Sequence, residues 1–197
     1  MVYYCPPFGP SPGNNDWGTR WDDAFGPIAT IGKTGFTEEV FRDTPFLVQF
    51  TKHNLDATIQ GAVQVGHEWN LDTEIKLHLH LLPMANGAGD AYFTYTYYLA
   101  PIGAAVPAVA SWTTGVLAVS LVAGDQYDHI ARTIFSFTPS GGTPSSILLF
   151  EVIRESTNIL DTYATNKDHG TAQANLGILY VDAHYQRNSP GTATELA

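Results

Sequence analysis

The chain has little of three things that would narrow its function: cysteine, basic residues and long apolar runs. Cys5 is the single cysteine among 197 residues, which excludes an internal disulfide framework and an all-cysteine zinc site. Nine Lys and Arg residues stand against 19 Asp and Glu, giving a net charge of -10, so we expect no nucleic-acid partner. No apolar run approaches the ~20 residues that span a bilayer, and the N-terminus lacks the pattern of a signal peptide. We therefore expect a protein that folds in a cytosol and has no membrane partner.

The surface must be built mainly from neutral polar residues. Charged residues make up only 14% of the chain, against 44% hydrophobic and 12% aromatic residues. Such a surface is suited to close contact with other protein.

Residues 74–83, EIKLHLHLLP, show the clearest two-residue alternation and predict a half-buried strand that Pro83 ends. Seven further stretches have the aromatic, β-branched or alternating content of strands: 46–50, 57–65, 92–99, 116–122, 130–138, 147–154 and 178–186. Only 37–41 and 171–176 could form short helices. We predict an all-β fold, a jelly-roll-like antiparallel β-sandwich with an extended N-terminal arm.

Residues 1–35 differ from the rest in composition. They hold five of the twelve prolines and show no periodicity, so we interpret them as a Pro/Gly-rich arm that precedes a β-sandwich domain at 36–197. A solvated linker would not carry so many large aromatic residues. We expect Tyr3, Tyr4, Trp17 and Trp21 to form an interface with a neighbouring subunit; the alternative is an arm that packs along its own domain.

His78 and His80 project from the same face of the 74–83 strand, and Asp182 and His184 share a face of the 178–186 strand. If the two strands are neighbours, three imidazoles and a carboxylate converge, a set that suits Zn, Fe, Mn or Ni. The His-x-His pattern with a later His resembles the cupin family, whose members hold a catalytic metal in a jelly roll. The cupin motif has a Glu where this chain has Met84 and Ala85. We therefore predict no cofactor and no metal centre, and regard His78, His80, Asp182 and His184 as a face that lines a symmetry axis, collects an ion or is merely exposed.

Several short motifs occur together along the chain: residues 21–23 (WDD), 78–83 (HLHLLP), 161–163 (DTY) and 181–186 (VDAHYQ). In that order they resemble a group of tailed-bacteriophage virion proteins. The resemblance implies a β-sandwich component of a phage particle, a trimer on the head surface or a fibre-associated piece of the tail.

We accordingly expect a non-enzymatic capsid decoration or cement protein, located on the virion surface. Its expected partners are the major capsid protein and itself, as a homotrimer held by multivalent contacts. Two alternatives stay open. One is a tail or head-fibre module that binds host carbohydrate through Tyr95, Tyr97 and Trp112. The other is a cupin-like metal enzyme.

Overall fold

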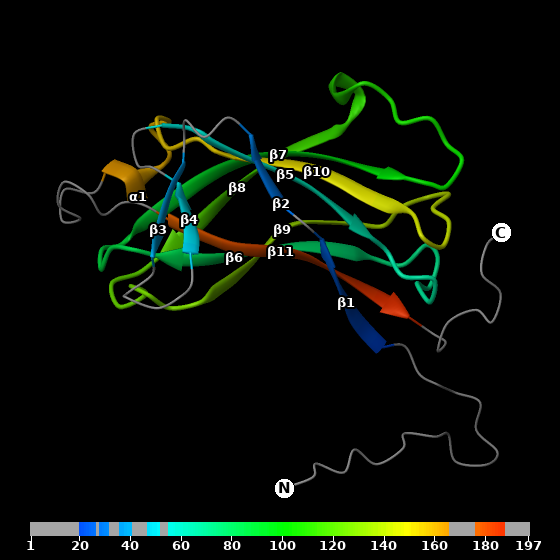
Figure 1. The fold of residues 1–197 in the computed structure, drawn as a ribbon, viewed down its shortest axis with the longest axis horizontal. Helices are drawn as coiled ribbons and strands as arrows, with labels where there is room; N and C mark the ends of the chain where they lie inside the picture. Colours follow the sequence, from blue (N-terminus) through cyan, green and yellow to red (C-terminus); the bar gives the residue numbers. More distant parts are fainter. Residues whose placement is uncertain are drawn as a thin grey trace, which may run out of the picture.

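The computed structural model describes residues 20–26, 28–31, 36–40, 47–51, 55–165 and 176–187. Within these residues the chain forms two antiparallel sheets that pack face to face (Figure 1). The strands are β1 (Arg20–Gly26), β2 (Ile28–Ile31), β3 (Phe36–Val40), β4 (Leu47–Thr51), β5 (Ala57–Gln64), β6 (Ile75–Pro83), β7 (Gly89–Ala100), β8 (Thr113–Leu121), β9 (Ile130–Phe137), β10 (Ile147–Arg154) and β11 (Leu176–Arg187). The predicted all-β sandwich is confirmed.

The first sheet is six-stranded, in the order β3-β4-β11-β6-β9, with β1 also paired to β11. The long strand β11 carries two neighbours on one edge: residues 176–178 pair with β4, and residues 181–187 pair with β1. Its other edge pairs with β6, with a register shift between Ile178 and Tyr180. The second sheet is five-stranded, in the order β2-β5-β10-β7-β8.

The core lies between the sheets and follows the period-two alternation of the strands. In β6 the side chains of Ile75, Leu77, Leu79 and Leu81 are fully buried. From the second sheet they face Leu148, Phe150 and Val152 of β10, among others. Each such side chain contributes about 1.5–3 kcal/mol relative to an exposed one. The alternate residues of the same strands face outward and form the two outer faces of the sandwich.

One end of the sandwich holds a buried ion pair. The Arg154 guanidinium donates to both carboxylate oxygens of Asp161, at 2.9 and 3.1 Å, and to the Thr51 hydroxyl at 2.9 Å. The side chains of Arg154 and Asp161 are 0% exposed. Asp161 directly precedes the short helix α1 (Thr162–Thr165), so the pair ties this loop to β10 and β4.

The structure corrects the prediction for residues 20–31. They were assigned to an arm, but they form β1, which pairs with β11, and β2, which pairs with β5. In β1 the small Ala24 packs against the core while the large Trp21 and Phe25 are exposed, so the sequence lacks the apolar alternation of a half-buried strand. Tyr3, Tyr4 and Trp17 lie outside the described residues.

The two predicted short helices have different outcomes. Residues 36–40 form strand β3 rather than a helix, because pairing with β4 gives this short segment the backbone hydrogen bonds that a two-turn helix could not supply in isolation. Residues 171–175 lie outside the described part. Among the described residues, no helix is long and apolar enough to cross a membrane.

Candidate functional site

Two outer faces of the sandwich carry candidate sites, and the first is a cluster that we name the histidine face. It comprises His78 and His80 of β6, Asp182 and His184 of β11, and His129, which precedes β9. Asp182 lies directly opposite His78 in the β6–β11 register, and His80 lies opposite Tyr180. The structure thus brings together the four residues that the sequence singled out, and adds His129.

Asp182 is the centre of the polar contacts on the histidine face. Its Oδ1 lies 3.3 Å from His80 Nε2 and its Oδ2 lies 3.3 Å from His184 Nε2. His80 Nδ1 lies 2.6 Å from His129 Nε2, and the rings of His78 and His184 are tilted against each other with centroids 4.0 Å apart. Asp182 and His80 are buried, at 3% and 7% exposed. A carboxylate at this depth requires such partners.

Burial sets the charge state of two of these imidazoles. Desolvation lowers the pKa of His78, and the neighbouring His184 lowers it further, although Asp182 opposes the shift. Desolvation also lowers the pKa of His80, against the opposing effect of Asp182. Both rings are therefore mainly neutral at pH 7. His78 Nε2 is buried and has no hydrogen-bond partner in the described part of the chain.

Aromatic side chains border the histidine face. Tyr180 stacks on His80 with centroids 3.8 Å apart, and Phe25 of β1 packs edge-on against Tyr180 at 5.8 Å. Trp21, the one predicted arm residue within the described residues, is 46% exposed, and the Lys76 ammonium lies 4.8 Å from its ring centroid. Phe25 is 68% exposed.

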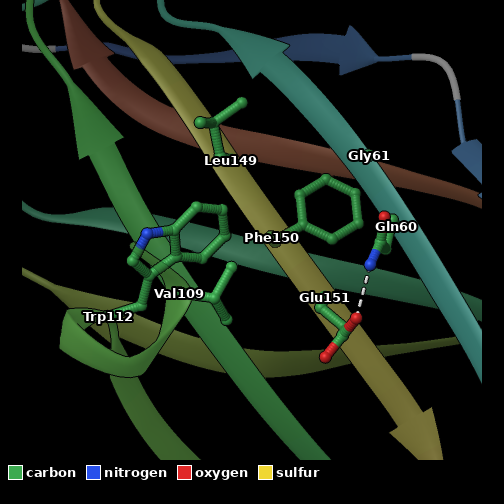
Figure 2. A pocket seen from close by; sticks show the side chains of 7 residues that line it. All are labelled: Gln60, Gly61, Val109, Trp112, Leu149, Phe150 and Glu151. Atoms are coloured by element: carbon green, nitrogen blue, oxygen red, sulfur yellow. Dashed lines mark hydrogen bonds between the residues drawn. The ribbon is translucent and has the colours of Figure 1, made fainter. Parts of the chain in front are cut away.

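The second candidate is a shallow pocket of about 190 Å³ on the outer face of the second sheet, which we name the Trp112 pocket. It lies where the 3-10 turn Val109–Ser111 and Trp112 fold over β5 and β10. The lining residues are Gln60, Gly61, Val109, Trp112, Leu149, Phe150 and Glu151. Figure 2 shows Trp112 and Val109 on one side and the hydrogen-bonded pair of Gln60 and Glu151 on the other.

The two sides of the Trp112 pocket are chemically different. The Trp112 indole is half-buried and is fixed by a hydrogen bond from its Nε1 to the Pro107 carbonyl oxygen, at 3.1 Å, and by a ring contact with Tyr98 at 6.1 Å. On the other side, Gln60 Nε2 donates to Glu151 Oε2 at 2.5 Å. Thr96 lies opposite Glu151 in the β7–β10 register, and its buried hydroxyl has no partner among the described residues.

The aromatic residues predicted as stacking platforms separate into two groups. Tyr95 and Tyr97 face the core, where they pack on Phe135 at 5.1 and 4.0 Å between ring centroids, so they are not surface platforms. Trp112, in contrast, lines the Trp112 pocket. Sequence reasoning missed Gln60 and Glu151, because only the pairing of β5 with β10 places them side by side.

Comparison with known proteins gives similarity at the level of fold. No family model matches the chain, and no curated protein sequence matches it. Similar solved structures include the arabinose-bound MgGH51 α-L-arabinofuranosidase (9% identity, TM-score 0.40, covering 81% of this chain and 23% of that one). They also include TmCBM61 in complex with β-1,4-galactotriose (6% identity, TM-score 0.36, coverage 83% and 88%). A third is the mannan-recognising module TmCBM27 (10% identity, TM-score 0.38, coverage 84% and 98%). At these values the likeness goes no further than the β-sandwich.

These comparisons correct the resemblance inferred from short motifs. The similar structures named here are a glycoside hydrolase and carbohydrate-binding modules, not phage virion proteins. The assignment to a virion protein family is therefore wrong. Residues 78–83 and 181–186, two of the motifs behind it, are the paired strands β6 and β11, whose alternation is what any half-buried sheet requires.

Proposed function

We propose that this protein is a non-catalytic module that binds a neutral carbohydrate in the Trp112 pocket. The observation that supports this most directly is the pairing, within one shallow pocket, of a fixed half-buried indole with a hydrogen-bonded carboxylate and amide. A sugar ring has an apolar face of C–H groups and an edge of hydroxyl groups. These match the apolar side and the polar side of the pocket.

The indole side of the pocket supplies the apolar contact. Trp112 is held at two points, by Pro107 and by Tyr98, so stacking a sugar ring on it costs little side-chain entropy. Val109 is 53% exposed and extends the apolar surface beside the indole. Aromatic residues with a fixed orientation are the usual anchors of binding sites.

The polar side supplies the orientation. Glu151 uses Oε2 to accept the bond from Gln60, and the described residues make no hydrogen bond to its Oε1. That oxygen can accept a hydroxyl proton, and Gln60 keeps its carbonyl oxygen as a second acceptor. A charge-assisted bond from a sugar hydroxyl to Glu151 is worth about 1.5–3 kcal/mol. The same carboxylate, on a chain with a net charge of -10, disfavours uronic-acid and sulfated glycans.

The carboxylate count favours binding over hydrolysis. Glycosidases place two carboxyl groups across the scissile bond, about 5–9.5 Å apart. Glu151 is the single carboxylate among the described residues that line the Trp112 pocket. We therefore propose that the protein releases the bound sugar without cleaving it. The predicted homotrimer and the predicted partnership with a major capsid protein stay predictions.

The test is a titration of intrinsic tryptophan fluorescence, and of heat by calorimetry, with a panel of neutral oligosaccharides and their acidic counterparts. We expect saturable binding of at least one neutral glycan, lost in Trp112→Ala. Trp21→Ala is the matched control, because it removes an exposed tryptophan from the opposite sheet and should leave binding unchanged. Glu151→Gln should weaken binding without abolishing the fluorescence change. Equal loss in both tryptophan variants, or no binding across the panel, would overturn the proposal.

A further inference from the structure

We propose that His78, Asp182 and His184 form a binding site for a divalent transition-metal ion on the outer face of the first sheet. β6 and β11 are adjacent, Asp182 lies directly opposite His78, and His184 follows two residues later on the same face. One ligand atom from each residue lies within 4.8 Å of the others. Two ligands of a tetrahedral zinc ion lie about 3.3 Å apart, at a metal–ligand distance of about 2.0 Å. Side-chain movements that shorten the longest of these separations by roughly 1.5 Å therefore complete the site.

An unpartnered atom points to the same conclusion. His78 Nε2 is buried, and within the described part of the chain no donor or acceptor reaches it. Leaving a buried polar atom unsatisfied costs about 1–3 kcal/mol, and such atoms are few in folded proteins. A metal ion bound at this nitrogen would remove that cost. The ring contact with His184, at 4.0 Å between centroids, already brings the two imidazoles together.

Groups around the three ligands have the arrangement that supports a metal centre. Asp182 Oδ1 contacts His80 Nε2 at 3.3 Å, and His80 in turn contacts His129 at 2.6 Å. Outer partners of this kind fix the orientation of a ligating carboxylate. Asp23 Oδ1 of β1 lies 3.2 Å from His184 Nε2 and is half-exposed, so it is placed to contribute a further oxygen or to hold a metal-bound water.

The donor set selects the class of ion. Two imidazole nitrogens and one carboxylate oxygen suit Zn²⁺, Co²⁺, Ni²⁺ or Fe²⁺, whereas Ca²⁺ and Mg²⁺ require mainly oxygen ligands. Three protein ligands leave at least one coordination position for water or an external ligand. The site lies on the sheet opposite the Trp112 pocket, so it is independent of the proposed carbohydrate binding.

The experiment uses the full untagged chain, stripped with chelator and titrated with Zn²⁺ by calorimetry, with Ca²⁺ and Mg²⁺ as comparison ions. A second series loads Co²⁺ and records its visible absorption, which reports the coordination geometry. We expect one Zn²⁺ per chain, a rise in melting temperature on loading, and no comparable effect of Ca²⁺ or Mg²⁺. His78→Ala and Asp182→Asn should each abolish the binding of one Zn²⁺ per chain.

Two further variants separate a metal site from a merely structural cluster. His80→Ala removes an outer partner and should weaken Zn²⁺ binding about 10–100-fold while the stoichiometry stays the same. His67→Ala is the matched control, because His67 contacts Ser145 rather than the cluster, and it should bind as the parent protein does. Failure of the parent chain to bind Zn²⁺ would overturn the proposal. So would binding that survives in folded His78→Ala, or that is lost in His67→Ala.

Discussion

The buried pair of Arg154 and Asp161 gives the sharpest test of how the sandwich is held together. Asp161→Asn keeps the shape of the side chain and removes its charge. The Arg154 guanidinium then stays fully buried but loses the charged partner that accepts two of its hydrogen bonds. We expect the free energy of unfolding to fall by about 3–5 kcal/mol, the usual cost of breaking a buried ion pair by neutralising one partner.

The double variant Arg154→Met with Asp161→Leu separates the cost of breaking the pair from the value of the intact pair. Because it removes both charges together, most of the loss should be recovered. The Asp161 carboxylate also accepts a bond from the Tyr92 backbone N–H, at 3.2 Å. Because that donor loses its partner in the double variant, we expect a residual destabilisation of about 1–3 kcal/mol.

Urea unfolding followed by circular dichroism measures all three proteins, with the slope of the transition expected to stay constant and its midpoint to move. The control is the surface pair of Asp22 and Arg187, which are 3.1 Å apart and more than a third exposed. Asp22→Asn should cost about 0–1 kcal/mol. If Asp161→Asn costs no more than Asp22→Asn, the reasoning about the buried charge is refuted.

Three further predictions concern other parts of the fold. Gly26→Ala should destabilise the protein by about 1–3 kcal/mol, measured by urea unfolding, because a Cβ there would overlap the Ala62 carbonyl oxygen; a neutral effect would contradict the contact between β1 and β5. Burial, and secondarily the hydrogen bond to Glu68, raises the pKa of Tyr185 above its ordinary value of 10.0. The unfolded chain therefore loses this proton at a lower pH than the folded protein does, and the free energy of unfolding should fall as pH rises above about 10. A Tyr185→Phe protein should show a shallower alkaline decline, and an unchanged pH profile would exclude Tyr185 as its source. Thr96→Val should be neutral or slightly stabilising in thermal unfolding, because it removes a buried hydroxyl that has no partner among the described residues; a loss above about 1 kcal/mol would show that this hydroxyl makes a stabilising hydrogen bond.

Local alternation in the sequence was enough to find most strands between residues 47 and 187. The 74–83 prediction matches β6 to within one residue, and 147–154 matches β10. Burial alternates along the whole of β10 and over the first half of β6, so a two-residue period is visible in their side chains, whereas from Leu79 to Pro83 both faces of β6 are buried. The prediction failed at residues 20–31 and 36–40. β1 and β2 pair with β11 and β5, which lie far along the chain, and the five-residue β3 is ordered by pairing with its neighbour β4 rather than by its own side chains.

The two candidate sites could likewise be predicted from the sequence only in part. The sequence showed that His78 and His80 share a face, and that Asp182 and His184 share another, because each pair lies two residues apart on one strand. That these faces are one cluster depends on the β6–β11 register, which joins residues about a hundred positions apart. The Trp112 pocket could not be predicted from local sequence, because Gln60 and Glu151 meet only across paired strands and Trp112 reaches them from a turn. Side-chain periodicity therefore determined which way each residue points, while strand order and register, set by burial of the whole core, decided which residues meet.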